Sequence, residues 1–147
     1  MGIKSILFTV MAASALMVSA KPLTVSSPDN NISLKFDTDK GIAKYSVERN
    51  GKTILSPSRL GIDIKDGVDF SEGFSVARSS QDSHSETWHP VWGEEAEIAD
   101  NYNELRVTLA QKKLAPGRTL DIVFRVFNDG IGFRYEFPRQ KDLGDFT

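Results

Sequence analysis

Apolar and polar residues alternate along most of the chain beyond position 22, which is the period of half-buried β-strands. The alternation is clearest over 32–37, 43–47, 60–64, 105–109, 120–126 and 131–137. Asn50-Gly51 separates two such runs and favours a two-residue hairpin turn, because both turn positions need positive φ. The pattern predicts nine or ten strands joined by short turns, with one weak helical turn at 93–100 as the exception.

Short strands with hairpin signals at regular spacing are typical of an all-β, antiparallel sandwich or barrel. We expect a single domain over 21–147. Val123 and Phe127 make the second face of strand 120–127 partly apolar, so this strand should be central and covered on both sides. The polar stretch 140–147 leaves the last edge of the sheet uncovered, and we therefore expect a sandwich that is incomplete at its C-terminal end.

The first twenty residues have the three parts of a secretory signal peptide. Lys4 is the positive charge, Ile6 to Met17 is an apolar stretch, and Val18-Ser19-Ala20 offers small residues for cleavage after Ala20. The apolar stretch is too short for a membrane span, although a signal anchor stays open as an alternative. Because the chain has no cysteine, we expect a secreted or periplasmic bacterial protein more than a disulfide-stabilised eukaryotic one.

Charge argues against a nucleic-acid partner. The formal net charge is −2, and removal of Lys4 with the leader leaves 17 basic and 20 acidic residues, or 17 − 20 = −3. Nucleic-acid binding needs a clustered basic face, which this chain lacks. Asp63, Asp66, Gly67 and Asp69 resemble a calcium loop only superficially, because their spacing departs from the EF-hand pattern and a hairpin turn explains them.

The densest group of aromatic and acidic residues lies at 86–94. Trp88, His89, Trp92 and Glu94 could form a carbohydrate site, with rings stacked on a sugar face and a carboxylate accepting hydroxyl hydrogen bonds. The structural alternative is a strand corner at Pro90 whose tryptophans fill the core or a domain interface. Further along, the polar groups of Tyr102, Asn103 and Glu104 could face a neighbouring domain.

Neither a metal site nor a catalytic pair is predicted. His84 and His89 are five residues apart, so a continuous strand places them on opposite faces. The acidic run of Glu94, Glu95 and Glu97 is better explained as a solvated loop than as glycosidase carboxylates, since adjacent strand residues point apart. Arg125 and Arg134 lie on the polar faces of paired strands, where they could meet Glu136 or a second domain.

Three separated motifs resemble the N-terminal domain of glycoside hydrolase family 97. They are Trp88-His89-Pro90-Val91-Trp92-Gly93-Glu94, Asn101-Tyr102-Asn103-Glu104-Leu105, and the run from Phe124 to Phe137; Val25 to Asp29 and Leu60-Gly61 add to the match. The resemblance implies a galactose-mutarotase-like β-super-sandwich that packs on a catalytic (β/α)8 barrel. It also implies an exo-acting α-glucosidase or α-galactosidase as the longer parent, with a calcium ion in the barrel.

The chain departs from that family in length, because it lacks the barrel and the later part of the super-sandwich. No catalytic residue or metal ligand is therefore transferred to it. Only the surface of Trp88, His89, Trp92, Glu94, Tyr102, Asn103 and Glu104 is carried over, as barrel-facing or sugar-proximal. The main hypothesis is a non-catalytic N-terminal domain of a secreted α-glycosidase. The alternatives are a stand-alone carbohydrate-binding module and a structural fragment without independent function.

Overall fold

The computed structural model describes residues 21–64, 68–89, 91–92, 97–111, 117–140 and 143. The signal peptide predicted for 1–20 lies outside these residues. The described parts of the chain form ten β-strands and no helix. The strands are β1 (Leu23–Ser26), β2 (Ile32–Asp39), β3 (Ile42–Arg49), β4 (Lys52–Arg59), β5 (Ile62–Ile64), β6 (Val68–Phe70), β7 (Ser75–Trp88), β8 (Ile98–Ala110), β9 (Thr119–Phe127) and β10 (Ile131–Glu136).

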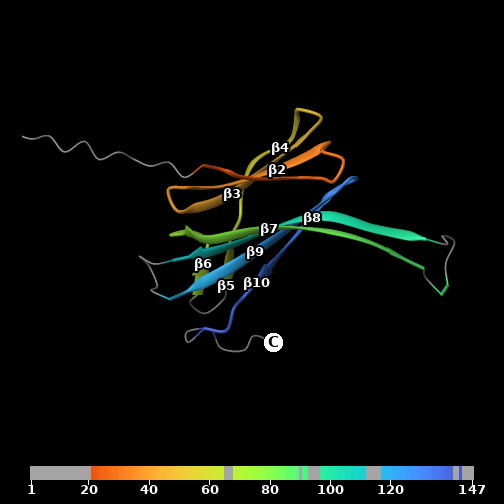
Figure 1. Ribbon diagram of the computed structural model, residues 1–147. Coiled ribbons are helices and arrows are strands. Elements are labelled where there is room, and N and C mark those ends of the chain that lie inside the picture. The colour runs from red at the N-terminus through yellow and green to blue at the C-terminus, as the bar shows by residue number, and fades with distance from the viewer. Residues whose placement is uncertain are drawn as a thin grey trace, which may run out of the picture.

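The strands form two four-stranded antiparallel sheets and one small hairpin. The first sheet has the order β1-β2-β3-β4, the second has the order β10-β9-β8-β7, and β5 pairs with β6 alone. The sheets face each other, with β1 packed on β8 and β2 on β9 (Figure 1). The predicted antiparallel sandwich is therefore confirmed.

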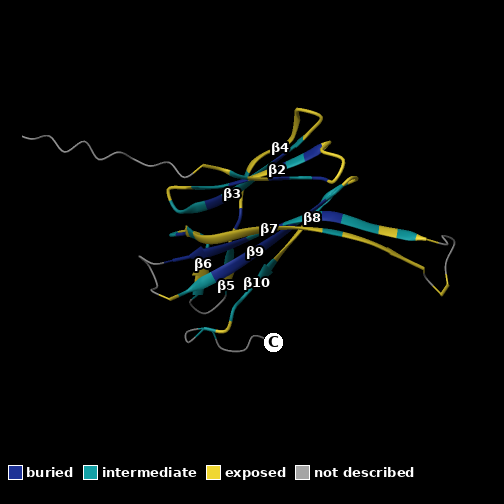
Figure 2. Cartoon of the chain, viewed as in Figure 1, coloured by how far each residue is buried: buried dark blue, intermediate teal, exposed yellow. Residues whose placement is uncertain are grey.

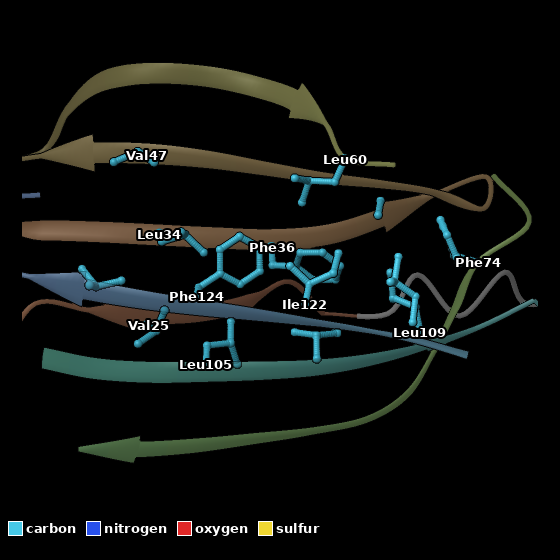
Figure 3. Close-up of a cluster of buried hydrophobic side chains, with 14 of the residues drawn as sticks. Val25, Leu34, Phe36, Val47, Leu60, Phe74, Leu105, Leu109, Ile122 and Phe124 are labelled. Atoms are coloured by element: carbon cyan, nitrogen blue, oxygen red, sulfur yellow. The ribbon is translucent and has the colours of Figure 1, made fainter. Parts of the chain in front are cut away.

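The core lies between the two sheets and is built from the alternating apolar positions. Leu34 and Phe36 on β2 face Leu105 on β8 and Phe124 on β9, and all four side chains are fully buried (Figure 3). The rings of Phe36 and Phe124 are 5.9 Å apart. Burying side chains of this size contributes about 1.5–3 kcal/mol each, which makes this interlayer the main source of stability.

Two hairpin turns set the register of the first sheet. Asn50 and Gly51 both have positive φ, 51° and 75°, which confirms the predicted turn between β3 and β4. Lys40 and Gly41 form a similar turn between β2 and β3, with φ of 51° and 83°. The sequence pattern missed this second turn because lysine is not a usual residue at a positive-φ position.

Strand β9 is central, as predicted, with β10 on one side and β8 on the other. Val123 is fully buried although it points away from the core. Its neighbours across the ladder are Arg106 on β8 and Arg134 on β10. The apolar stems of such long side chains cover neighbouring surface while their charged ends stay in water, so arginines cover this face of the strand.

Strands β7 and β8 continue well past the sandwich as a two-stranded ribbon. Tyr102, which pairs with His84 on β7, is the last β8 residue that also pairs with β9. From there on β7 and β8 pair only with each other, over His84 to Trp88 and Ile98 to Asn101. This ribbon, called the arm below, projects from the body and is mostly exposed or half-exposed (Figures 1 and 2). The helical turn predicted at 93–100 is wrong for Ile98 to Asp100, because these residues belong to β8 and pair with Glu86 to Trp88. Residues 93–96 lie outside the described residues.

Candidate functional site

The far end of the arm exposes large apolar side chains. Trp88 is 47% exposed, Val91 is 88% exposed and Trp92 is 90% exposed. The alternative in which these tryptophans fill the core is therefore wrong, because this end of the ribbon extends beyond the two sheets that enclose the core. His89 is also exposed and directly follows β7, while Glu94 lies outside the described residues. Exposed apolar surface of this kind is typical of a contact site for another molecule or domain.

A cluster of aromatic and charged side chains marks the point where the arm leaves the sandwich. The Tyr102 ring is only 8% exposed. Its centroid is 4.8 Å from that of the stacked His84 ring and 5.2 Å from that of Phe127. The guanidinium carbon of Arg125 lies 4.4 Å from the Tyr102 centroid. This arrangement combines a cation–π contact with ring stacking and ties the arm to β9.

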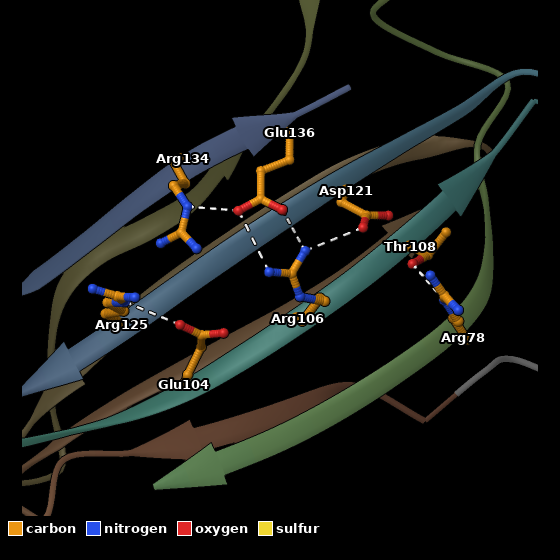
Figure 4. A network of polar contacts seen from close by, with 8 residues as sticks. All are labelled: Arg78, Glu104, Arg106, Thr108, Asp121, Arg125, Arg134 and Glu136. Carbon is orange, nitrogen blue, oxygen red and sulfur yellow. Dashed lines mark hydrogen bonds and ion pairs between the residues drawn. The ribbon is translucent and has the colours of Figure 1, made fainter. Parts of the chain in front are cut away.

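The predicted polar trio at 102–104 is divided between the two faces of β8. Glu104 accepts a hydrogen bond of 3.0 Å from Nε of Arg125 on the same face as Tyr102 (Figure 4). Asn103 points to the opposite face, where its Nδ2 donates to the carbonyl oxygen of Ser26 at 2.8 Å. The trio therefore does not form one surface, because successive strand residues alternate between faces.

A four-residue ion-pair network covers the outer face of β8–β10. Arg106 bonds the carboxylates of Glu136 and Asp121, and Nε of Arg134 donates to Glu136 at 2.7 Å (Figure 4). Hydrogen bonding to Arg106 and then to Arg134 holds the pKa of Glu136 below its usual range. The same contact with Glu136 raises the pKa of Arg106. The predicted meeting of Arg134 with Glu136 is confirmed, whereas the partner of Arg125 is Glu104.

The described carboxyl groups whose pKa clearly shifts are all bound by structural partners. A general acid in glycoside hydrolysis needs a raised pKa. Each carboxyl pKa that clearly moves here is lowered, namely those of Asp29, Asp39, Asp69 and Glu136, with hydrogen bonds to neighbouring side chains as the largest cause. These groups are held as anions by structural partners.

Within the described ranges, no group of three or more His, Asp or Glu side chains is arranged to hold a metal ion. His84 Nε2 lies 3.4 Å from a carboxylate oxygen of Glu86 and 3.8 Å from one of Asp100, which is an ion-pair arrangement when the imidazole is protonated. Asp63 and Asp69 pair across the β5–β6 hairpin, and the intervening Asp66 and Gly67 lie outside the described residues. The resemblance places its calcium ion in the barrel, and the described side chains supply no group of ligands for such an ion.

Residues on β7 are the part of the site that the sequence pattern missed. Gln81 Nε2 donates to the carbonyl oxygen of Thr24 at 2.9 Å, and Ser83 Oγ donates to Oδ1 of Asn103 at 2.7 Å. Together with Asn103 they border a hollow of about 340 Å³ between β1 and β7. The available signal was a run of uncharged polar residues at every second position, Ser79, Gln81, Ser83 and Ser85.

No helix in the portion of the chain that the structure describes has the length and apolar character to cross a membrane.

Comparison with known proteins gives a consistent family. The family model described as glycosyl-hydrolase 97 N-terminal matches residues 25–147. A retaining alpha-galactosidase of Bacteroides thetaiotaomicron is 29% identical over 115 residues, which are 78% of this chain and 16% of the relative. A family 97 glycoside hydrolase from Pseudoalteromonas sp. strain K8, solved with acarbose, is 36% identical with a TM-score of 0.77.

That match covers 82% of this chain and 18% of the Pseudoalteromonas enzyme. A beta-arabinopyranosidase crystal structure matches with a TM-score of 0.71 and 28% identity, over 80% of this chain and 18% of the other. The chain thus spans about a sixth of the length of these relatives.

Proposed function

Because this chain belongs to the glycosyl-hydrolase 97 N-terminal family, we propose that it is the non-catalytic N-terminal domain of a secreted α-glycosidase. In that role it supports the catalytic (β/α)8 barrel of a longer polypeptide and contributes to carbohydrate binding. The lengths of the relatives support this, since each continues far beyond the matched segment. The substrate class is an α-glucoside or an α-galactoside.

The observation that carries the proposal is the arm with its exposed Trp88, Val91 and Trp92. A two-stranded ribbon by itself is marginally stable in water and needs a further surface to pack on. Tryptophan combines a large apolar area with one polar N–H, which suits both an interdomain contact and a sugar ring. We therefore assign the end of the arm to the contact with the barrel and its substrate entrance.

Secretion belongs to the same proposal. It is supported by the leader-like sequence of 1–20 and by the absence of cysteine, and it places the domain in the periplasm or outside a bacterial cell. The calcium ion expected in the longer polypeptide would be held by residues outside this segment.

Two experiments test the proposal. The chain alone, assayed with aryl α-glucosides and aryl α-galactosides, should show no turnover; robust hydrolysis would refute a non-catalytic role. In a chimaera, residues 25–147 replace the matching segment of the Pseudoalteromonas enzyme. There Trp92→Ala should lower the thermal stability and the kcat/KM, although it leaves the chain alone unchanged. Ile54→Ala on β4, at a side chain that is 63% exposed, is the matched control. Equal effects of the two variants would contradict docking through the arm.

The exposure of both tryptophans also favours a second candidate, a stand-alone secreted carbohydrate-binding module. It predicts measurable affinity of the chain for maltooligosaccharides or galactosides by calorimetry, with loss of binding in Trp88→Ala and Trp92→Ala. Flat titrations at millimolar sugar would exclude this candidate and leave the first one standing.

A further inference from the structure

We propose that the hollow between β1 and the inner face of β7–β8 is a binding subsite for a neutral polyhydroxylated ligand, such as a single sugar ring. The hollow has a volume of about 340 Å³ and is lined by Val25, Ser26, Gln81, Asp82, Ser83 and Asn103. It lies apart from the exposed tryptophans at the end of the arm, and the inference holds whether or not the chain acts within a larger glycosidase.

The two faces of the β7–β8 ribbon differ in chemistry. The outer face carries charged side chains at Asp82, Glu86, Asp100 and Glu104, together with His84. The inner face continues the plane of the core. Apart from Leu105 and Val107, which belong to the core, its positions from Ser79 to Ser85 and the β8 positions opposite them are uncharged and able to hydrogen bond. These inner positions are Ser79, Gln81, Ser83, Ser85, Asn101 and Asn103. A face without charge but rich in donors and acceptors suits a ligand with the same character.

The two side-chain amides in the hollow are held in place by the protein, yet each keeps hydrogen-bonding groups for a ligand. Gln81 donates one N–H to the Thr24 carbonyl. Asn103 donates one N–H to the Ser26 carbonyl, and its Oδ1 accepts one hydrogen bond from Ser83. A carboxamide has two N–H donors and an oxygen with two lone pairs, so each keeps capacity for a ligand. Because β1 fixes both amides before any ligand binds, less side-chain conformational entropy is lost on binding.

The lining also excludes other ligand classes. No lining residue is cationic, so an anion would find no counter-charge in the hollow. A divalent cation prefers several carboxylate or carbonyl oxygens, and a single acidic residue does not supply them. A purely apolar ligand would remove water from the amides without replacing its hydrogen bonds. Hydroxyl groups can donate to the amide oxygens and accept from the remaining amide N–H groups, and Val25 adds a small apolar part to the lining.

The test is an NMR titration of the isotope-labelled chain with methyl α-D-galactopyranoside and methyl α-D-glucopyranoside, with galacturonate as the charged comparator. The side-chain amide signals of Gln81 and Asn103 should shift and saturate with a millimolar dissociation constant for at least one neutral glycoside. Galacturonate should bind more weakly, because its carboxylate would lose water without meeting a cationic side chain. Absence of saturable shifts with both neutral glycosides would overturn the proposal.

A matched pair of variants locates the site. Ser83→Leu fills the hollow and should weaken binding by about tenfold or more, which corresponds to about 1.4 kcal/mol. Ser85→Leu lies two residues further on the same face, where Ser85 makes the equivalent bond to Asn101 at 2.8 Å, but outside the hollow. It should bind like the unmodified chain.

Equal weakening by both serine variants, or loss of binding in Trp92→Ala, would assign the affinity elsewhere and overturn the proposal. If Ser83→Leu does not fold, Gln81→Met provides the second variant with the same expected loss. Loss of turnover or docking in the chimaera leaves this titration unaffected, so failure of the proposed function is distinguishable from failure of the subsite.

Discussion

Tyr102 should hold the arm to the body of the domain, and Tyr102→Ala tests this directly. The ring is nearly buried and contacts His84, Phe127 and the Arg125 guanidinium at centroid distances of 4.4 to 5.2 Å. Truncation of a buried aromatic residue costs about 3–5 kcal/mol. We expect the lower end, about 3 kcal/mol, because the surrounding side chains lie on an outer face and are free to relax. The cation–π contact accounts for about 1 kcal/mol of this loss.

The assay combines equilibrium unfolding in urea with amide hydrogen exchange. Domains of this size are stable by about 5–15 kcal/mol, so the variant should still fold. The amides of the arm, His84 to Trp88 and Ile98 to Asn101, should lose protection, whereas those of Leu105 to Leu109 should keep it. This selective loss follows because β9 supports β8 only up to Tyr102.

Tyr102→Phe is the control, since it keeps the ring and its stacking, and it should change stability by no more than about 0.5 kcal/mol. The reasoning is refuted if Tyr102→Ala costs less than about 1 kcal/mol, or if the arm exchanges as slowly as before. In that case the ribbon would be stable without its anchor.

Three further changes test the packing and the ion pairs. Gly61→Ala should lower the free energy of unfolding in urea by about 1–3 kcal/mol, because its Cβ would lie 2.8 Å from Cα of Ser71. Gly132→Ala is the control, since no atom lies within 4 Å of its Cβ position. Equal costs of the two variants would contradict this reasoning. Glu136→Gln should cost up to about 1 kcal/mol at neutral pH. The pKa of Glu136 is lowered, so the stabilisation is fully present at pH values above the usual glutamate pKa and is lost as the pH falls through the lowered pKa. A difference in stability between the variant and the unmodified chain that persists in strong acid would contradict this. Gln140→Leu should cost about 1–3 kcal/mol in thermal unfolding, because Gln140 makes two 2.8 Å hydrogen bonds to the backbone of Thr119, and an unchanged Tm would show that water replaces them.

Strands with a buried face could be predicted from the sequence, and strands without one could not. Leu105, Val107 and Leu109 alternate because their side of β8 is the core, and the pattern located that strand. Strand β7 has the same backbone geometry, yet only Val76, Ala77 and Trp88 are apolar along its fourteen residues. Hydrophobic periodicity reports burial. The inner face of β7 is polar from Ser79 onward and its end from His84 lies in the arm, so the pattern located only the beginning of the strand.

The candidate site was predicted as a set of residues but not as an arrangement. The exposure of Trp92 depends on how far the ribbon extends. The placement of Asn103 on the opposite face of β8 from its neighbours depends on which face of the ribbon points toward the core. The partners of Tyr102 depend on the pairing of β8 with His84 on one side and Phe127 on the other. Such long-range register is set by the packing of whole sheets, and local sequence carries little information about it.

The hydrogen bonds at β1 also bear on aggregation. An edge strand normally displays unpaired carbonyl and N–H groups on which another molecule can build a strand. On β1 the carbonyls of Thr24 and Ser26 are already occupied by the side-chain amides of Gln81 and Asn103 from the facing sheet. A foreign strand would have to displace both amides before it could add here. This edge is therefore protected against templated growth without the lysine or proline that edge strands commonly use.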